Sequence, residues 1–124
     1  MCQIGIKLIE IIKQIHDTGN VYNDLKLDNI LIGDKLSSLE SMHEIRVIDF
    51  GFATHFQDQT GQHLPLGEQV FRGNMAFCSK HTMSFRTQSR RDDLISLNYI
   101  LLYLHQGKFD ILKDLEDNQF EVLK

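Results

Sequence analysis

The chain has 124 residues, of which 42% are apolar and 24% charged, and its formal net charge is −4. This length fits one small domain, and the acidic balance argues against nucleic-acid binding. Two cysteines do not make a disulfide framework, and no apolar run approaches the roughly 20 residues of a membrane span. We therefore expect one intracellular domain, cytoplasmic or nuclear, without a nucleic-acid or membrane partner.

A helix is predicted over residues 3–17. Apolar residues recur there at the 4-3-4 spacing of one helical face, namely Ile4, Leu8, Ile11 and Ile15. Ile6, Ile9 and Ile12 extend the apolar surface around the helix. A helix with so wide an apolar surface is expected to be well buried. Gly19 and Asn20 tolerate the left-handed conformation that ends helices, and they are predicted to end this one.

The rest of the chain predicts a mainly α fold with one small β-hairpin. Polar residues 23–29 indicate a structured loop, and short strands are expected at 30–32 and 45–48, joined by a surface excursion. Residues 52–89 lack periodicity, which is typical of a functional or irregular segment. A second strong helix is predicted over 91–105, ending near Gly107. The tail, residues 108–124, alternates apolar and acidic residues and suggests a further amphipathic helix.

Two polar segments carry residue types suited to phosphoryl transfer. Such a reaction needs a carboxylate to orient or accept the proton of the attacking hydroxyl. It also needs hard oxygen ligands for Mg²⁺ and positive charge near the transferred phosphate. Asp24 and Lys26 supply the carboxylate and the cation, and Asn29 and Asp49 supply oxygen ligands.

Together these segments resemble the catalytic loop and the metal-binding loop of protein kinases. The pattern is Asp-Leu-Lys-x-x-Asn from Asp24, then a strand pair, then Asp-Phe-Gly from Asp49. The resemblance implies ATP and Mg²⁺ as cofactors and transfer of the γ-phosphate to protein serine or threonine. It implies Asp24 as the catalytic aspartate, Lys26 as the lysine that neutralises the γ-phosphate, Asn29 and Asp49 as Mg²⁺ ligands, and Leu31 and Ile48 as the floor of the adenine pocket.

Residues 88–97 narrow the resemblance to the casein kinase 1 group. They match that group's helix-start signature, and Arg72-Gly73-Asn74, Ser79 and His63-Leu64-Pro65 align with its activation segment. The resemblance then implies that Asp93 holds the catalytic loop by backbone hydrogen bonds. It implies one partial kinase domain over residues 1–124, with a C-terminal-lobe core at about 3–107 and a tail at 108–124. The implied partner is a protein substrate, acidic or already phosphorylated, and the oligomeric state is not indicated.

Several positions depart from that pattern. Asn23 replaces the arginine that gathers an activation-loop phosphate, so control by that route is not expected. Asn74 and Asn98 replace a threonine and a glycine, and the Pro-Trp pair after Gly107 is absent. No Gly-rich phosphate loop or strand lysine precedes Asp24, so we expect the isolated chain to lack useful kinase activity.

Other interpretations remain open. A calcium loop from Asp24 lacks the glycine and glutamate that such loops require. A zinc site would have to use ligands at an unfamiliar spacing, namely Cys78, His81, His55 and His63. The rivals to an enzyme segment are a non-catalytic, kinase-derived interaction fragment and a decayed copy without a stable fold.

Overall fold

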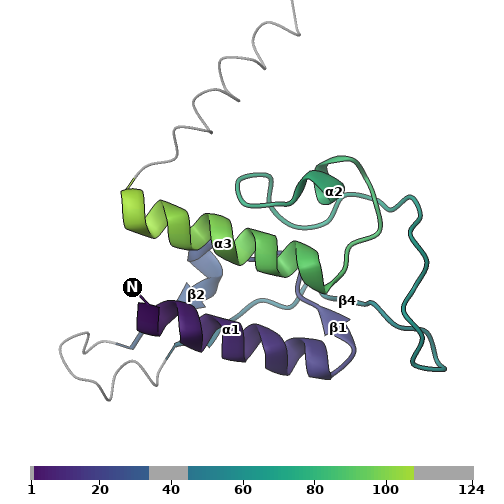
Figure 1. The fold of residues 1–124 in the computed structure, drawn as a ribbon, viewed down its shortest axis with the longest axis horizontal. Coiled ribbons are helices and arrows are strands. Elements are labelled where there is room, and N and C mark those ends of the chain that lie inside the picture. The colour runs from purple at the N-terminus through teal and green to yellow at the C-terminus, as the bar shows by residue number, and fades with distance from the viewer. Residues whose placement is uncertain (1, 34–44, 108–124) are drawn as a thin grey trace, which may run out of the picture.

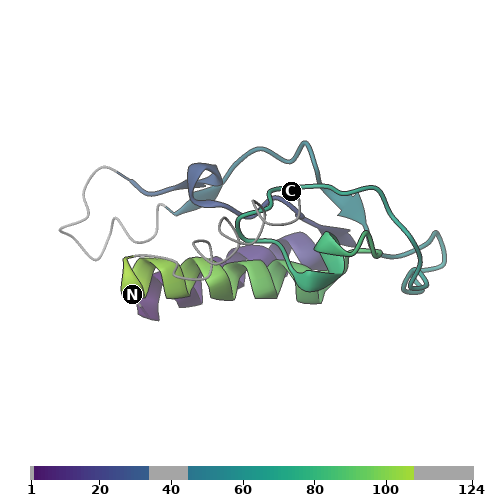
Figure 2. The same ribbon diagram turned by 90° about the horizontal axis from the view of Figure 1, so that it is seen from above.

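Two long helices form the framework of the protein. The computed structural model describes residues 2–33 and 45–107. Helix α1 (Cys2–Asp17) and helix α3 (Arg90–Gln106) lie side by side (Figure 1). Both predicted helices are thus confirmed to within one residue at each end. Figure 2 shows them in one layer, with the strands on one side of it.

In the described ranges, 2–33 and 45–107, four two-residue strands form two small antiparallel sheets. Strand β2 (Ile30–Leu31) pairs with β3 (Arg46–Val47), which confirms the expected hairpin partners. Strand β1 (Asn20–Val21) pairs with β4 (Thr54–His55), a second sheet that the sequence did not predict. Asn20 was expected to end α1 in a left-handed conformation, but it is the first residue of β1, and Gly19 alone has the positive φ of 81°.

The polar segment at 22–29, here called the Asp24 loop, ends in a single 3₁₀ turn, η1 (Leu27–Asn29), that leads directly into β2. The segment at 52–89 contains one regular helical turn, α2 (Lys80–Met83), which periodicity did not reveal. The Ser79 side chain accepts a hydrogen bond from the Thr82 backbone N–H and so caps α2. The predicted tail helix and the excursion at 34–44 lie outside the described residues.

The core lies between α1 and α3 and includes the base of the Asp24 loop. Gly5 allows the helices to approach closely, because a Cβ there would lie 3.3 Å from a methyl carbon of Leu101. The buried cluster consists of Leu8, Ile12, Tyr22, Leu25, Ile45, Phe77, Leu97 and Ile100. Tyr22 and Leu25 belong to the Asp24 loop, so the loop is fixed by burial of its own side chains.

The prediction that α1 is buried over most of its circumference is wrong. Its buried line runs through Gly5, Leu8 and Ile12, where α3 packs against it. Ile6 and Ile9 are 59% and 49% exposed, since no described segment covers that side of the helix. The apolar pattern therefore indicated the helix correctly but did not indicate how much of its surface another element covers.

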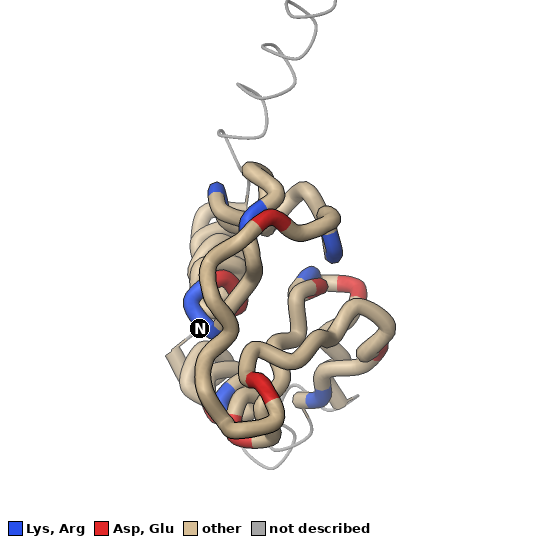
Figure 3. Tube along the Cα trace, turned by 90° about the vertical axis from the view of Figure 1, so that its right-hand side faces the viewer, with Lys and Arg blue, Asp and Glu red and all other residues tan. Residues whose placement is uncertain are grey.

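Charged residues are dispersed over the described part of the chain. Figure 3 shows acidic and basic positions interspersed along the trace in that view, without a continuous basic stripe. In residues 2–33 and 45–107, no helix is both long enough and apolar enough to cross a membrane.

Candidate active site

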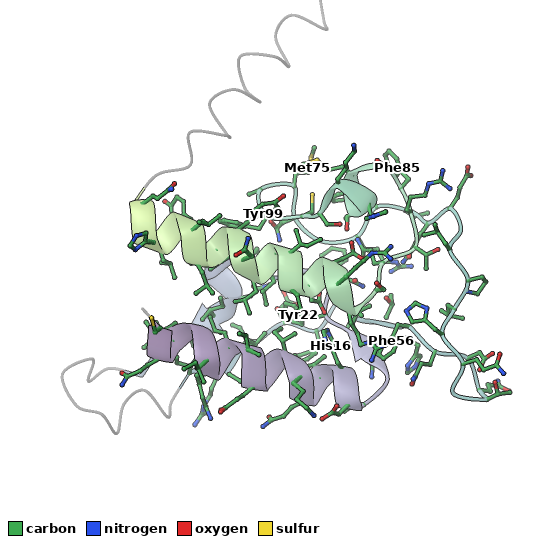
Figure 4. All side chains as sticks on the ribbon, in the orientation of Figure 1. His16, Tyr22, Phe56, Met75, Phe85 and Tyr99 are labelled. Carbon is green, nitrogen blue, oxygen red and sulfur yellow. The ribbon has the colours of Figure 1, made fainter. Side chains whose placement is uncertain are left out.

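The backbone of the Asp24 loop is held by a buried carboxylate on α3. Asp93 is 2% exposed. Its Oδ2 accepts a hydrogen bond from the Tyr22 N–H and its Oδ1 accepts one from the Asn23 N–H, both at 2.8 Å. The His16 ring nitrogen Nε2 lies 2.8 Å from the same Oδ2, which ties in the end of α1. Figure 4 shows Tyr22 and His16 between the two long helices. One side chain thus joins α1, the loop and α3.

Three nitrogen donors converge on the carboxylate of Asp24. Asp24 is 1% exposed. Its Oδ2 lies 2.9 Å from the Lys26 Nζ and accepts a hydrogen bond from the Asn29 Nδ2 at 3.0 Å. Its Oδ1 accepts a third from the Asn74 Nδ2 at 3.3 Å. The hydrogen bond to Asp24 raises the pKa of Lys26 above its usual value, so Lys26 remains a cation at neutral pH.

Asn74 connects the Asp24 loop to the distant 52–89 segment. Besides Asp24, its Nδ2 donates to the Leu25 carbonyl at 2.9 Å, and its Oδ1 accepts from the Phe77 N–H at 2.9 Å. In the sequence, Asn74 aligns with the activation segment of the casein kinase 1 group but replaces a threonine there. Its amide in fact uses both its donor and its acceptor to hold the carboxylate and the backbone around it.

Asp49 stands on a turn beside the same loop. The Ile48 N–H donates to the Asn29 carbonyl at 3.0 Å, which places the start of this turn next to the Asp24 loop. Asp49 has a φ of 62°, and its Oδ1 accepts from the Gly51 N–H at 3.1 Å. A positive φ is uncommon outside glycine, and aspartate is among the residues that tolerate it. The turn therefore presents an exposed carboxylate with one oxygen held by the backbone.

Tyr22 links this turn to the core. Its hydroxyl donates to the Ile48 carbonyl at 2.5 Å, and its ring meets the Phe50 ring edge-on at a centroid distance of 5.3 Å. Burial, with the neighbouring carboxylates Asp24 and Asp49 contributing, raises the pKa of Tyr22 from 10.0 to about 12. The phenol is therefore held in its neutral, donating form.

This shift predicts a loss of stability in alkali. Tyr22 ionises more readily in the unfolded chain, so its contribution is complete below pH 10 and declines as the pH rises from 10 to about 12. The expected loss is about 2–3 kcal/mol over that range. Urea unfolding at pH 9, 10.5 and 11.5 measures it. Tyr22→Phe is the control, and its stability should fall less steeply; an equal slope in both proteins would contradict the assignment to Tyr22.

Comparison with known proteins identifies the family of the chain. Residues 2–123 match the protein kinase domain family. The chain belongs to the protein kinase family. It is 37% identical over 108 residues to the casein kinase 1-like protein HD16 of Oryza sativa subsp. japonica, a match that covers 85% of this chain and 15% of the rice protein.

Two yeast proteins give similar matches. Casein kinase I homolog 2 of Schizosaccharomyces pombe is 37% identical over 103 residues, covering 82% of this chain and 23% of that protein. Casein kinase I homolog 1 of Saccharomyces cerevisiae is 35% identical over 107 residues, covering 85% and 20% respectively. Within the kinases the chain is therefore casein kinase 1-like, as its motifs indicated, and it spans less than a quarter of the length of these relatives.

The residues present fit the Mg²⁺ that protein kinases generally use. Mg²⁺ binds one or two protein oxygens and completes its shell with phosphates and water, so it needs no large cluster of protein ligands. In the described residues no three His, Cys, Asp or Glu side chains gather as a metal site. Asn29 donates through its nitrogen to Asp24, which leaves its amide oxygen as the atom suited to a cation, and Asp49 stands exposed beside it. Asn29 and Asp49 would hold the ion.

Leu31 and Ile48, the two apolar residues assigned to the adenine floor, lie in or directly after the strands next to this site. Leu31 is in β2 and is 48% exposed, and Ile48 follows β3 and is 40% exposed. The described structure thus brings Asp24, Lys26 and Asn29 together in one loop, with Asp49 on the adjoining turn and the exposed side chains of Leu31 and Ile48 on neighbouring backbone. Asp93 is buried and bonds to the backbone of the loop, at Tyr22 and Asn23.

Sequence reasoning missed three supporting residues. His16 had no assigned part, although it contacts Asp93. The motif comparison notes the arginine and the threonine that Asn23 and Asn74 replace, which does not reveal the hydrogen bonds of the two amides. The available signals were weak: Asn23 directly precedes Asp24, His16 lies near the end of the helix before the loop, and Asn74 belongs to the segment that aligns with the activation segment. Their meaning depended on partners about 30 to 80 positions away, which spacing does not show.

Proposed function

We propose that this chain is the catalytic-loop part of a casein kinase 1-like serine/threonine kinase domain, corresponding to the core of its C-terminal lobe at about residues 3–107. The convergence of Lys26, Asn29 and Asn74 on the Asp24 carboxylate carries the proposal. Three donors from two separate segments fix both oxygens of one carboxylate. Such pre-organisation serves catalysis by positioning, which is the main contribution of the protein to phosphoryl transfer.

In the proposed reaction Asp24 orients the attacking hydroxyl of a protein serine or threonine and accepts its proton. Lys26 remains protonated next to Asp24 and offsets negative charge on the transferred phosphate. Asn29 and Asp49 hold Mg²⁺, which when bound to ATP neutralises the phosphates and aligns them for attack. Asp93 acts indirectly, by fixing the backbone that carries Asp24.

The substrate is proposed to be a protein inside the cell, in the cytoplasm or nucleus. A preference for acidic or phosphorylated neighbours rests on family resemblance alone. In the structure Lys26 pairs with Asp24, and Arg90 lies over the Phe56 ring, 4.6 Å from its centroid, so neither cation carries a proposal for a substrate contact. Phosphoryl transfer is proposed for the complete kinase domain, because the chain spans only 15–23% of the three relatives.

Calorimetric titration of the folded chain with Mg-ATP directly tests the proposed binding of Mg²⁺ and nucleotide at Asn29 and Asp49. The wild-type chain is expected to bind, and Asp49→Asn is expected to weaken binding about tenfold or more, because it removes an anionic oxygen ligand. Asp17→Asn is the matched control, since it makes the same charge change in an exposed surface pair with Lys13 and should leave binding unchanged. Replacing Mg²⁺ by EDTA should abolish the difference between the variants.

The opposite outcomes are equally informative. If a chain shown to be folded by circular dichroism binds no Mg-ATP, the non-catalytic interaction fragment becomes the better reading. If Asp17→Asn weakens binding as much as Asp49→Asn, the effect is one of net charge and the assignment of Asp49 is wrong.

A further inference from the structure

Asn23 lies between the Asp93 anchor and the Asp24 carboxylate, and it faces the segment that follows Asp49-Phe50-Gly51. It is 8% exposed and has a φ of 70°. Asparagine adopts the left-handed region more readily than most residues. The backbone N–H of Asn23 is already bonded to Asp93, so its side chain is free to serve another purpose.

The Asn23 amide nitrogen uses both of its hydrogens on one short stretch. It donates to the Phe52 carbonyl and to the Thr54 Oγ1, each at 2.8 Å. Both acceptors are neutral. These contacts join the Asp24 loop to the first residues of the 52–89 segment across about 30 positions of sequence.

The backbone of Asn23 also packs against a second part of the 52–89 segment, at Gly73. A Cβ built on Gly73 would lie 2.1 Å from the Asn23 carbonyl oxygen, so the chain at Gly73 presses directly on that peptide group. Asn23 therefore meets the 52–89 segment at two places, one near its beginning and one near Gly73.

The amide oxygen of Asn23 shows that the amide nitrogen is the atom that makes the contacts. The Asn23 Oδ1 is buried and has no hydrogen-bond partner among the described residues. An unpaired buried acceptor is unfavourable. Serine, threonine or aspartate at this position would have no amide oxygen to leave unpaired, but none of these side chains supplies two donor hydrogens. The unpaired oxygen is thus tolerated at a site where the NH₂ group is used in full.

We propose that Asn23 is a positioning residue, a neutral latch that fastens residues 52–54 to the Asp24 loop without a phosphate group. Asp49 lies between two fastened points, the Ile48 N–H on the Asn29 carbonyl and the latch at Phe52 and Thr54. The latch thereby limits the movement of the Asp49 turn. The purpose assigned to it rests on the proposed function, whereas its existence is testable without nucleotide.

Hydrogen exchange of the full chain, followed residue by residue by NMR, tests the latch. The reporters are the amides of Ala53 and Phe56, bonded to the Phe50 and Gly19 carbonyls. Amides of Ile12 and Ile100 in the helical core report global stability. Asn23→Gly keeps the positive φ but deletes both donors, and it is expected to speed exchange of the reporters about tenfold while the core amides stay unchanged.

A second position provides the matched pair. Thr54→Val removes one acceptor and is expected to speed reporter exchange about threefold, whereas Thr54→Ser keeps the hydroxyl and should behave as wild type. Adding Thr54→Val to Asn23→Gly should change nothing further, because the bond is already gone. Added inorganic phosphate should leave the wild-type exchange rates unchanged.

Several results would overturn the proposal. One is that neither Asn23→Gly nor Thr54→Val changes the exchange rates of the reporter amides; another is that exchange rises uniformly, at Ile12 and Ile100 as well. The proposal would also fail if the effects of the two substitutions on the reporter rates were strictly additive, or if phosphate slowed exchange of the reporters. If Asn23→Gly fails to fold, the comparison of Thr54→Val with Thr54→Ser tests the proposal by itself. Failure of Mg-ATP binding would count against the proposed function and leave these exchange results standing.

Discussion

Replacing Gly73 by alanine is expected to destabilise the protein by about 3–5 kcal/mol. Gly73 has a φ of 103°, a conformation that residues with a Cβ rarely adopt. The added methyl would also lie 2.1 Å from the Asn23 carbonyl oxygen and 3.1 Å from its carbon. Both atoms belong to the backbone of the Asp24 loop, which Asp93 holds in place, so the obstacle cannot simply rotate away.

Gly61→Ala is the matched control for Gly73→Ala. Gly61 also has a positive φ, 80°, but a Cβ there meets nothing within 4 Å. Its expected cost is only the conformational one, about 1–2 kcal/mol. Urea unfolding of the three proteins measures the difference. Equal destabilisation of the two variants would mean that the close contact between Gly73 and Asn23 contributes nothing.

Replacing Asp93 by asparagine is expected to cost about 3 kcal/mol or more. The carboxylate is 2% exposed and receives two backbone N–H groups and the His16 ring. An amide offers one acceptor oxygen, and its NH₂ group would face a backbone N–H that is itself a donor. At least one buried N–H would then lose its partner, and the Asp24 loop would lose its anchor.

Asp17→Asn is again the appropriate comparison, since it is the same substitution at an exposed ion pair and should change stability by less than about 1 kcal/mol. The measurement is the urea midpoint, together with the exchange rates of the Tyr22 and Asn23 amides. Persistent protection of those two amides in Asp93→Asn would contradict the role given to the carboxylate.

The long helices and their ends were predictable because their determinants are local. The 3.6-residue period of apolar side chains defined α1 and α3, and Gly107 has the left-handed φ of 72° expected where α3 ends. The strand partners β2 and β3 were also predictable, since both are short apolar runs flanking polar turns. Each of these signals lies within about fifteen neighbouring residues.

The second sheet and the exposure of α1 were not predictable in this way. Strands of two residues have no measurable period, so the pairing of Asn20–Val21 with Thr54–His55 left no pattern in the chain. The exposure of Ile6 and Ile9 depends on which surfaces other segments cover. The single helical turn α2 depends on the Ser79 cap, and one polar residue in a polar segment is a weak signal.

For the candidate site, the sequence indicated the residue types and the family: Asp24, Lys26, Asn29 and Asp49 stand at a motif spacing, and the comparisons with known proteins agree on the family. The family resemblance implied Asp93 as the support of the loop, but only the tertiary structure decided the contacts of Asn74 and Asn23. Asp93 bonds to the Asp24 loop across 71 positions and Asn74 does so across 49, whereas Asn23, within the loop, bonds to Thr54 across 31. Local periodicity encodes which face a residue occupies, but a hydrogen bond between distant segments exists only once packing of α1 against α3 has brought them together.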